Sequence, residues 1–345
     1  MHKMSGRKIV RLAVLMHALL RSRLQGKPFF LSHLVTTRCN CSCPMCLWRD
    51  NSNGAEEMTA EEIGKLYRDG RQNGFIGTAI WGGEPLLRQD LGSILSHART
   101  CGLTTLLISN GFYLKERMEE LASNLDAVIV SLDYADAQQH DRQRGCAGLF
   151  KRAVEAVEHM RSHHPRIKVL LNCLMLRDNE DSLLPLAELA RDLGVSFFVC
   201  PIKEGTSSGV RGFSAKEWQA GMENERKIGQ KLTGLKKAGY TLNNSYAYLN
   251  KYLGKQEPFQ CHLPRIALII RPDGKITHCM ESTANLGNVT QQPLKDILSS
   301  PSYQELLHKA TQCNRCNNPN IVESSYMWQF QLEPLLNAAS VMLRQ

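Results

Sequence analysis

The stretch Cys39-Asn40-Cys41-Ser42-Cys43-Pro44-Met45-Cys46 decides both the fold and the chemistry expected of this chain. It contains a C-x₃-C-x₂-C run at Cys39, Cys43 and Cys46. Three thiolates on one short loop can hold three irons of a [4Fe–4S] cube, and the fourth iron then stays open to a small molecule that binds through an amine and a carboxylate. A structural zinc loop with a remote fourth ligand is the alternative. The apolar run at 29–35 predicts a strand that leads into this loop.

The charge of the chain is concentrated at its amino terminus. The 345 residues are 43% apolar, as in ordinary globular proteins, and carry a net charge of +9. No acidic residue precedes Asp50, whereas the basic residues before it are Lys3, Arg7, Lys8, Arg11, Arg21, Arg23, Lys27, Arg38 and Arg49. The rest of the chain balances its charges. Because no nucleic-acid module or interleaved aromatic pattern accompanies these residues, they favour contact with an anionic membrane surface and no nucleic acid.

Residues 7–24 predict an amphipathic helix whose arginines, Arg7, Arg11 and Arg21, fall on another face from its apolar residues. The apolar residues are Ile9, Leu12, Ala13, Met16, Leu19, Leu20 and Leu24. The segment is too short and too charged to span a bilayer, and no signal-peptide cleavage site follows it. It is therefore either an interfacial helix or a helix packed on the barrel with solvated arginines. The first alternative would bury four side chains in lipid, namely Leu12, Met16, Leu19 and Leu20.

Twelve cysteines without an export signal favour metal or redox use in a reducing compartment over disulfides. Seven of them have ligand-like spacings. The other five are expected to be packing residues, and they are Cys41, Cys101, Cys146, Cys173 and Cys200. The predicted location is cytoplasmic, and peripheral to the inner face of the membrane if the amino-terminal helix binds lipid.

Apolar strand-like runs alternate with helical patterns as far as residue 201. Six strands and five or six helices at this spacing are typical of βα units, and strands that are apolar throughout are buried on both faces. The predicted fold class is α/β, a partial (β/α)₆ TIM-like barrel with a small carboxyl-terminal domain. The expected divisions are a basic helix at 1–32, the barrel at 33–213, a helical linker at 214–256 and the small domain at 257–345.

Polar or glycine-rich stretches stand at the carboxyl ends of five predicted strands. They are 39–46, 82–85, Asn110-Gly111, Ser131 with Asp133, and Cys200-Pro201. In a β/α barrel these ends form one rim, and the active site is built there. The sequence therefore predicts one site that all five stretches share.

Two of these stretches together resemble the radical S-adenosylmethionine (radical SAM) superfamily. The C-x₃-C-x₂-C run is followed by Gly82-Gly83-Glu84-Pro85, which is similar to the GGEP motif of that family. The resemblance implies a [4Fe–4S] cluster on the three cysteines and SAM on its open iron, with the glycine backbone and Glu84 engaging the SAM amino group. An ordinary strand-to-helix turn with Pro85 at the helix start is the alternative.

Ser131-Leu132-Asp133 and the later Arg144-Gly145 resemble a second pattern of this family. The resemblance implies that Ser131 and Arg144 hold the ribose and carboxylate of SAM, since an arginine fork suits a carboxylate. A surface arginine is the alternative for Arg144. Asn110 and Asn172 are further candidates for polar contacts to the nucleoside. Family members often place an aromatic residue directly after the third cysteine, whereas this chain has Leu47 there and Trp48 next, which leaves the adenine contact unassigned.

The carboxyl-terminal cysteines resemble an auxiliary-cluster region of the SPASM and twitch kind. They are Cys261, Cys279, Cys313 and Cys316, and a hairpin turn is predicted at 271–275 between two short strands. Four thiolates would saturate a second [4Fe–4S] cluster, which suits electron transfer or a structural role. A zinc site with four cysteine ligands is the alternative.

The resemblance implies an enzyme that reductively cleaves SAM, with a reductant such as flavodoxin or ferredoxin, to a 5′-deoxyadenosyl radical that abstracts hydrogen from a substrate. The basic, amphipathic segment at the amino terminus suggests a lipid-like or isoprenoid-like substrate at a membrane. Maturation of a ribosomally made peptide and oxidation of a soluble sugar or antibiotic precursor are alternatives. A non-catalytic iron–sulfur electron carrier is the remaining alternative, but it would not need residues 82–85 or Arg144.

Overall fold

A computed structural model of the chain describes residues 6–46, 56–202, 222–255, 259–279, 286–314, 316 and 318–342. Its centre is a sheet of eight strands in the order β6-β5-β4-β3-β2-β1-β7-β8. The first six are mutually parallel and are β1 (Phe30–Thr36), β2 (Gly77–Gly82), β3 (Thr104–Ser109), β4 (Ala127–Ser131), β5 (Lys168–Met175) and β6 (Ser196–Pro201). The structure thus confirms the six predicted strands and the α/β partial barrel.

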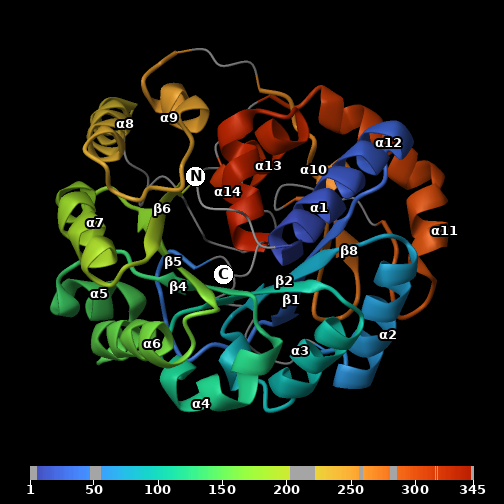
Figure 1. Cartoon of the computed structure of the whole chain (residues 1–345), viewed down its shortest axis with the longest axis horizontal. Coiled ribbons are helices and arrows are strands. Elements are labelled where there is room, and N and C mark those ends of the chain that lie inside the picture. The colour runs from blue at the N-terminus through green and yellow to red at the C-terminus, as the bar shows by residue number, and fades with distance from the viewer. Residues whose placement is uncertain are drawn as a thin grey trace.

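Helices cover the outer face of this curved sheet (Figure 1). They are α2 (Ala60–Gln72), α3 (Leu91–Thr100), α4 (Leu114–Leu121), α5 (Ala137–Arg144), α6 (Leu149–His163) and α7 (Leu183–Asp192). Alternate strand residues, such as Leu31, Leu107 and Val128, are fully buried against them. The start of α2 shows how the sequence sets a boundary, because Thr59 and Glu62 form a reciprocal capping box there.

The chain after the barrel is helical and packs beside the edge strand β6. Helices α8 (Met222–Lys237) and α9 (Tyr246–Tyr252) flank residues 241–244, which run alongside β6. The amide of Asn244 accepts from the Val199 N–H at 2.8 Å and donates to the Val199 carbonyl at 3.0 Å. The start predicted for this helical region falls within 203–221, outside the described residues.

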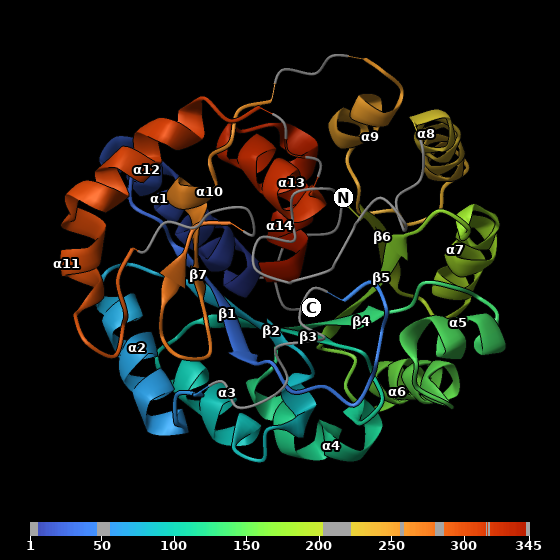
Figure 2. The same cartoon turned by 180° about the vertical axis from the view of Figure 1, so that it is seen from behind.

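The carboxyl-terminal region adds two strands to the barrel sheet. β7 (Ala267–Ile270) pairs in parallel with β1, and β8 (Ile276–Thr277) pairs with β7 in antiparallel fashion, which confirms the hairpin predicted at 271–275 (Figure 2). The remaining helices are α10 (Leu263–Ile266), α11 (Leu294–Ser299), α12 (Pro301–Thr311), α13 (Pro319–Trp328) and α14 (Leu332–Met342). Helices α13 and α14 fill the open side of the barrel between β6 and α10 (Figure 1).

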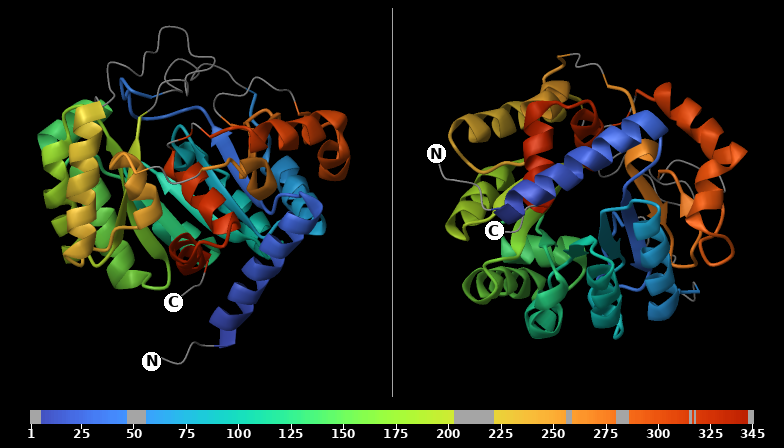
Figure 3. Two further views of the ribbon diagram at one scale, coloured as in Figure 1. Left: turned by 90° about the horizontal axis from the view of Figure 1, so that it is seen from above. Right: turned by 45° about the vertical axis from the view of Figure 1, so that its right-hand side comes forward.

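Helix α1 (Gly6–Gln25) lies at the end of the barrel opposite the cysteine loop (Figure 3, left). Leu15, Leu19 and Ser22 are buried against the body of the protein. Arg21 donates to three main-chain carbonyls of the body, those of Asn73, Pro28 and Gly74. The guanidinium of Arg23 lies 4.8 Å from the ring centroid of Trp328 in α13.

These contacts correct two parts of the interfacial-helix prediction. Leu19 is 0% exposed, so it packs on the barrel and cannot enter lipid. Arg21 binds the body and does not lie on a free polar face. The face of α1 that does reach solvent is apolar as well, with Val10, Leu20 and Leu24 exposed. No helix in the described part of the chain is long and apolar enough to cross a membrane.

Candidate active site

The cysteine loop after β1 is anchored by the end of α5. The main-chain N–H of Ser42 donates to the Arg144 carbonyl at 3.1 Å, and the Cys43 thiol approaches the same carbonyl at 3.4 Å. Helix α5 ends at Gly145, whose φ of 59° is left-handed. A side chain there would also overlap Ser42, so glycine is needed for both reasons. The family motif around Arg144 therefore supports the cysteine loop through its backbone.

The thiols of this loop are arranged to favour thiolates. A hydrogen bond with Cys41 lowers the pKa of Cys43 to about 7 against the effect of burial, and the charge of Arg144 lowers it further. The same Cys41 hydrogen bond lowers the pKa of Cys39. Because iron and zinc bind thiolate, Cys39, Cys43 and Cys46 fit the metal cluster that their spacing predicts. Cys41 lies among them as a hydrogen-bond partner, whereas the sequence predicted only a packing role for it.

The glycines of the 82–85 stretch bring β2 against the cysteine loop. Gly83 donates its N–H to the Thr36 carbonyl and Glu84 donates its N–H to the Arg38 carbonyl, both at 2.8 Å. A side chain at Gly82 or Gly83 would overlap these carbonyls. Close main-chain approach is therefore what this motif provides.

Glu84 is fully buried and accepts hydrogen bonds from the protein on both carboxylate oxygens. Its Oε1 accepts from Ser109 Oγ at 2.9 Å and from Leu86 N at 3.1 Å, and its Oε2 accepts from Asn110 N at 2.7 Å. Burial raises its pKa to about 7. The carboxylate thus joins the ends of β2 and β3. Pro85 begins a short 3₁₀ helix, which agrees with the alternative of a strand-to-helix turn at this motif. A contact between Glu84 and the SAM amino group stays a prediction.

Asp133 and Arg144 form a buried, two-pronged ion pair at the same rim. Arg144 Nε lies 2.6 Å from Asp133 Oδ2, and its Nη2 lies 2.8 Å from Oδ1. The Asp133 carboxylate also accepts from the Leu174 N–H at 2.9 Å. The fork expected to bind the SAM carboxylate is therefore held by Asp133, a residue that the sequence marked only as a strand end.

The three remaining predicted side chains lie around this network. Asn110 Nδ2 donates to Asn40 Oδ1 at 2.8 Å and approaches the Cys41 sulfur at 3.3 Å, so it contacts the cysteine loop. Ser131 and Asn172 are cross-strand partners on β4 and β5. The buried Oδ1 of Asn172 has no hydrogen-bond partner in the part of the chain that the structure describes. An unsatisfied amide oxygen near the rim fits a polar ligand such as a nucleoside. Leu47 and Trp48 lie outside the described residues.

The four carboxyl-terminal cysteines are also brought together. The Cys261 N–H donates to the Cys313 carbonyl at 3.0 Å. Burial raises the pKa of Cys261 to about 12, and the nearby charges of Cys313, Cys316 and Cys279 contribute to the shift. Thiols that raise one another's pKa in this way can be deprotonated together by a metal centre. Among the described residues no three of these sulfur atoms lie within 4.8 Å of one another, which disfavours a single zinc ion and leaves the larger iron–sulfur cluster as the better fit.

A cavity of about 610 Å³ occupies the inside of the barrel. It extends from Met45 in the cysteine loop to Leu15 of α1 and Val341 of α14. Alternate strand residues form its apolar wall, including Phe30, Ala79, Trp81, Leu106, Ile108, Ile129, Leu170, Leu174, Phe198 and Ile269. Ser131 and Asn172 share this side of the sheet, because Ser131 is two residues after Ile129 and Asn172 lies between Leu170 and Leu174. The predicted ligand residues and the cavity therefore lie on the same side of the sheet.

Comparison with known proteins agrees with this arrangement. A relative from Methanosarcina barkeri named AdoMet-dependent heme synthase is 27% identical, over 79% of this chain and 83% of its own. Streptococcus suis SuiB solved with the precursor peptide SuiA has a TM-score of 0.67 and 15% identity, covering 84% of this chain and 69% of its own. The enzyme anSMEcpe solved with AdoMet has a TM-score of 0.63 and 14% identity, covering 91% and 95%.

Family models assign the chain more directly than these single relatives do. Residues 34–190 match the radical SAM superfamily, and residues 261–317 match the SPASM iron–sulfur cluster-binding domain. The two matched regions contain all seven cysteines with ligand-like spacing. The chain belongs to the radical SAM superfamily and is a radical SAM enzyme with a [4Fe–4S] cluster, SAM and an auxiliary iron–sulfur region of the SPASM kind.

Proposed function

We propose that this enzyme abstracts a hydrogen atom from a substrate with a long apolar part, which lies in the barrel cavity. The observation that carries the proposal is the apolar cavity of about 610 Å³ that begins at Met45, within the cysteine loop. A cavity of this size can enclose a whole small ligand. Two of the polar residues in its wall are already engaged within the protein. Ser32 Oγ accepts from Trp81 Nε1 at 2.9 Å, and the amide of Asn244 is held by Val199.

The chain's own residues have three tasks in this reaction. Cys39, Cys43 and Cys46 would hold the SAM-binding cluster, and Asn172, whose buried Oδ1 lacks a partner among the described residues, would contact SAM, with Asn110 beside the cysteine loop. The bound cluster and SAM supply one-electron cleavage and hydrogen abstraction. The apolar wall excludes water and aligns the substrate chain towards the cysteine loop. The four carboxyl-terminal cysteines would hold the auxiliary cluster.

Other substrate classes fit the described cavity less well. A haem-type product, as in the name of the Methanosarcina relative, carries carboxylates, but no Lys or Arg lines the cavity among the described residues. A soluble sugar needs many hydrogen-bond partners, whereas the strand wall is apolar. A peptide, as in the SuiB complex, also needs partners for its main chain. A lipid-like or isoprenoid-like chain needs only the apolar surface.

Equilibrium dialysis of tritiated dodecanol against cluster-loaded protein tests this proposal. Wild type should bind the alcohol, and Ala79→Phe should weaken binding about tenfold or more by filling the cavity. Ala238→Phe is the matched control, because Ala238 is exposed and lies outside the cavity. Wild type that binds no dodecanol, or equal binding by Ala79→Phe, would contradict the proposal.

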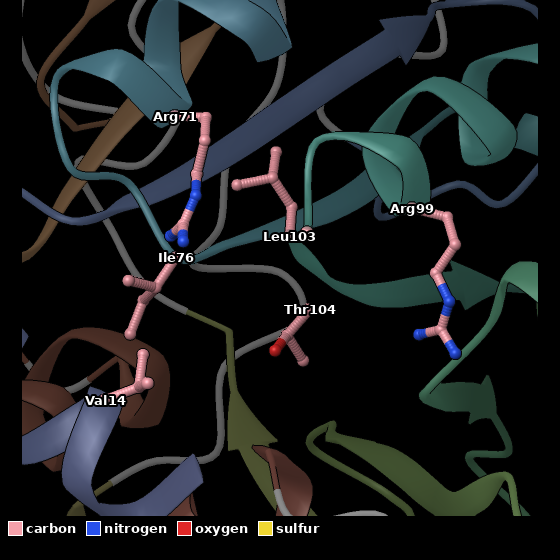
Figure 4. Close-up of a pocket in the computed structure, with 7 residues that line it drawn as sticks. Val14, Arg71, Ile76, Arg99, Leu103 and Thr104 are labelled. Carbon is pink, nitrogen blue, oxygen red and sulfur yellow. The ribbon is translucent and has the colours of Figure 1, made fainter. Parts of the chain in front are cut away.

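We also propose that the end of the barrel opposite the cysteine loop, at which α1 lies and which we call the base, contacts an anionic membrane surface from the cytoplasmic side. Val14, Leu20 and Leu24 of α1 are 40%, 51% and 86% exposed. Val14 also lines a pocket of about 230 Å³ together with Arg71 and Arg99 (Figure 4). Arg99 is paired with Asp126 at 3.4 Å, so Arg71 is the guanidinium left to pair with an anionic headgroup while the apolar side chains enter the acyl boundary. A membrane position would also bring the enzyme to an apolar substrate.

A further inference from the structure

Glu323 of α13 is the only carboxyl group among the described residues that line the barrel cavity. Its Oε1 accepts a hydrogen bond from the Ser245 N–H at 2.6 Å. Its Oε2 is buried and has no hydrogen-bond partner among the described residues. A buried carboxylate oxygen without a partner costs about 1–3 kcal/mol or more, so an arrangement of this kind is expected to have a partner supplied from outside the protein.

No described residue pairs a cation with this oxygen. The nearest lysine that influences Glu323, Lys236, is 2.8 Å from Glu333 Oε1 and donates to the Leu242 carbonyl at 2.7 Å. Both contacts hold its ammonium away from the cavity lining. Burial raises the pKa of Glu323 to about 7, which is the response expected of a carboxyl that faces an apolar space.

A purely structural role would not need a carboxylate at this position. Ser245 bonds to Glu323 through its N–H and its hydroxyl, and a neutral glutamine oxygen could accept from both. One neighbouring amide is used within the protein, since Asn337 Nδ2 donates to the Asn243 carbonyl at 2.7 Å. Oε2 is the buried, unpartnered acceptor that the described part of α13 offers to the cavity.

We infer that Glu323 binds an ammonium group on the apolar substrate, so that the auxiliary region selects an amine-bearing amphiphile. This inference rests on the proposed apolar-substrate function. An ammonium is the strongest donor for a buried carboxylate, because its hydrogen bond is charge-assisted. The strands of the barrel would then hold the apolar chain, while α13 would hold the amine. Glu323 is a specificity residue in this assignment and takes no part in hydrogen abstraction.

Competition between matched probes tests the inference. Tritiated dodecylamine, dodecanol and dodecanoate share one chain and differ in the head group, and each is dialysed against cluster-loaded protein at about pH 8, where the amine is cationic. Wild type should bind the amine about tenfold or more tighter than the alcohol, and dodecanoate weakest. Glu323→Gln should lose the preference for the amine and bind the alcohol at least as well, since it keeps the Ser245 bond. Glu323→Asp, which retains the charge on a shorter side chain, should retain part of the preference.

Glu305→Gln is the control. Glu305 lies on α12, pairs with Lys309 at the surface at 2.6 Å and does not line the cavity. Its variant should keep the amine preference. Equal binding of amine and alcohol by wild type, or loss of the preference in Glu305→Gln but not in Glu323→Gln, would overturn the assignment while leaving the apolar cavity intact. Failure of all three probes to bind would instead refute the apolar-substrate function on which the assignment rests.

Discussion

The rim and the base of this barrel bury very different side chains. At the rim, the carboxyl ends of the strands enclose Glu84, Asp133 and Arg144, whose charges are matched by hydrogen bonds within the protein. At the base, α1 buries apolar Leu15 and Leu19 and shows a second apolar face to solvent. A buried charge needs each of its partners, whereas apolar packing is shared among many contacts. The rim should therefore be sensitive to single polar changes, and the outer face of the base should tolerate them.

Arg144→Met should give the largest loss of stability, because it leaves the fully buried Asp133 without its ion-pair partner. Removing one partner of a buried pair costs about 3–5 kcal/mol of unfolding free energy. Chemical denaturation under anaerobic conditions measures this loss. Lys115→Met is the control, since its partner Glu155 is half-exposed and such surface pairs contribute about 1 kcal/mol or less. Similar losses of unfolding free energy in both variants would show that the buried pair at the rim is no more sensitive than a surface pair.

Glu84→Ala should give the next largest effect. The variant leaves the buried N–H groups of Leu86 and Asn110 without acceptors, which is expected to cost about 2–4 kcal/mol. Anaerobic denaturation together with SAM binding separates two roles of the motif. A loss of SAM affinity without a loss of stability would show that Glu84 acts on SAM and that the rim does not depend on it.

The rim should also respond to pH through Glu84. Burial raises the Glu84 pKa from 4.5 to about 7, so the folded state holds this proton more tightly than the unfolded state does. Its contribution to stability is therefore fully present below about pH 4.5 and is lost as the pH rises through about 7. The stability of wild type relative to Glu84→Gln should fall by about 1–3 kcal/mol between pH 5 and pH 8. At the base Arg21 stays protonated throughout this range, so no comparable pH dependence is expected there. A difference in unfolding free energy between wild type and Glu84→Gln that does not change with pH would contradict the raised pKa of Glu84.

Local patterns predicted most of the fold and the positions of the ligand cysteines. The spacing of Cys39, Cys43 and Cys46 and the βα rhythm both depend on neighbouring residues, and the structure confirms the βα rhythm. The pairing of Arg144 with Asp133 depends on how α5 returns to the rim, and no local pattern contains that geometry. Glu323 was missed for the same reason, because only the seating of α13 in the open side of the barrel places it at the cavity.

The face of α1 shows a further limit of sequence patterns. Its apolar residues surround much of the helix, so periodicity alone could not decide whether Leu19 or Leu24 meets the barrel. Burial of Leu19 and exposure of Leu24 settle that choice, and they change which residues a membrane experiment should alter.

The smallest effect on stability is expected at the outer face of α1. Leu20→Gln/Leu24→Gln should change the unfolding free energy by about 0.5 kcal/mol or less, because both side chains are mostly exposed. The same double variant should weaken sedimentation with anionic vesicles at low and high salt, since each leucine would contribute apolar burial that salt does not screen. Arg71→Gln should weaken only the salt-sensitive part, which falls off over a Debye length of about 10 Å at 0.1 M salt. Leu184→Gln on α7 removes a similarly exposed leucine away from the base and should leave vesicle binding unchanged. Wild type that stays in the supernatant with anionic vesicles at low salt would show that this face of the base has no membrane role.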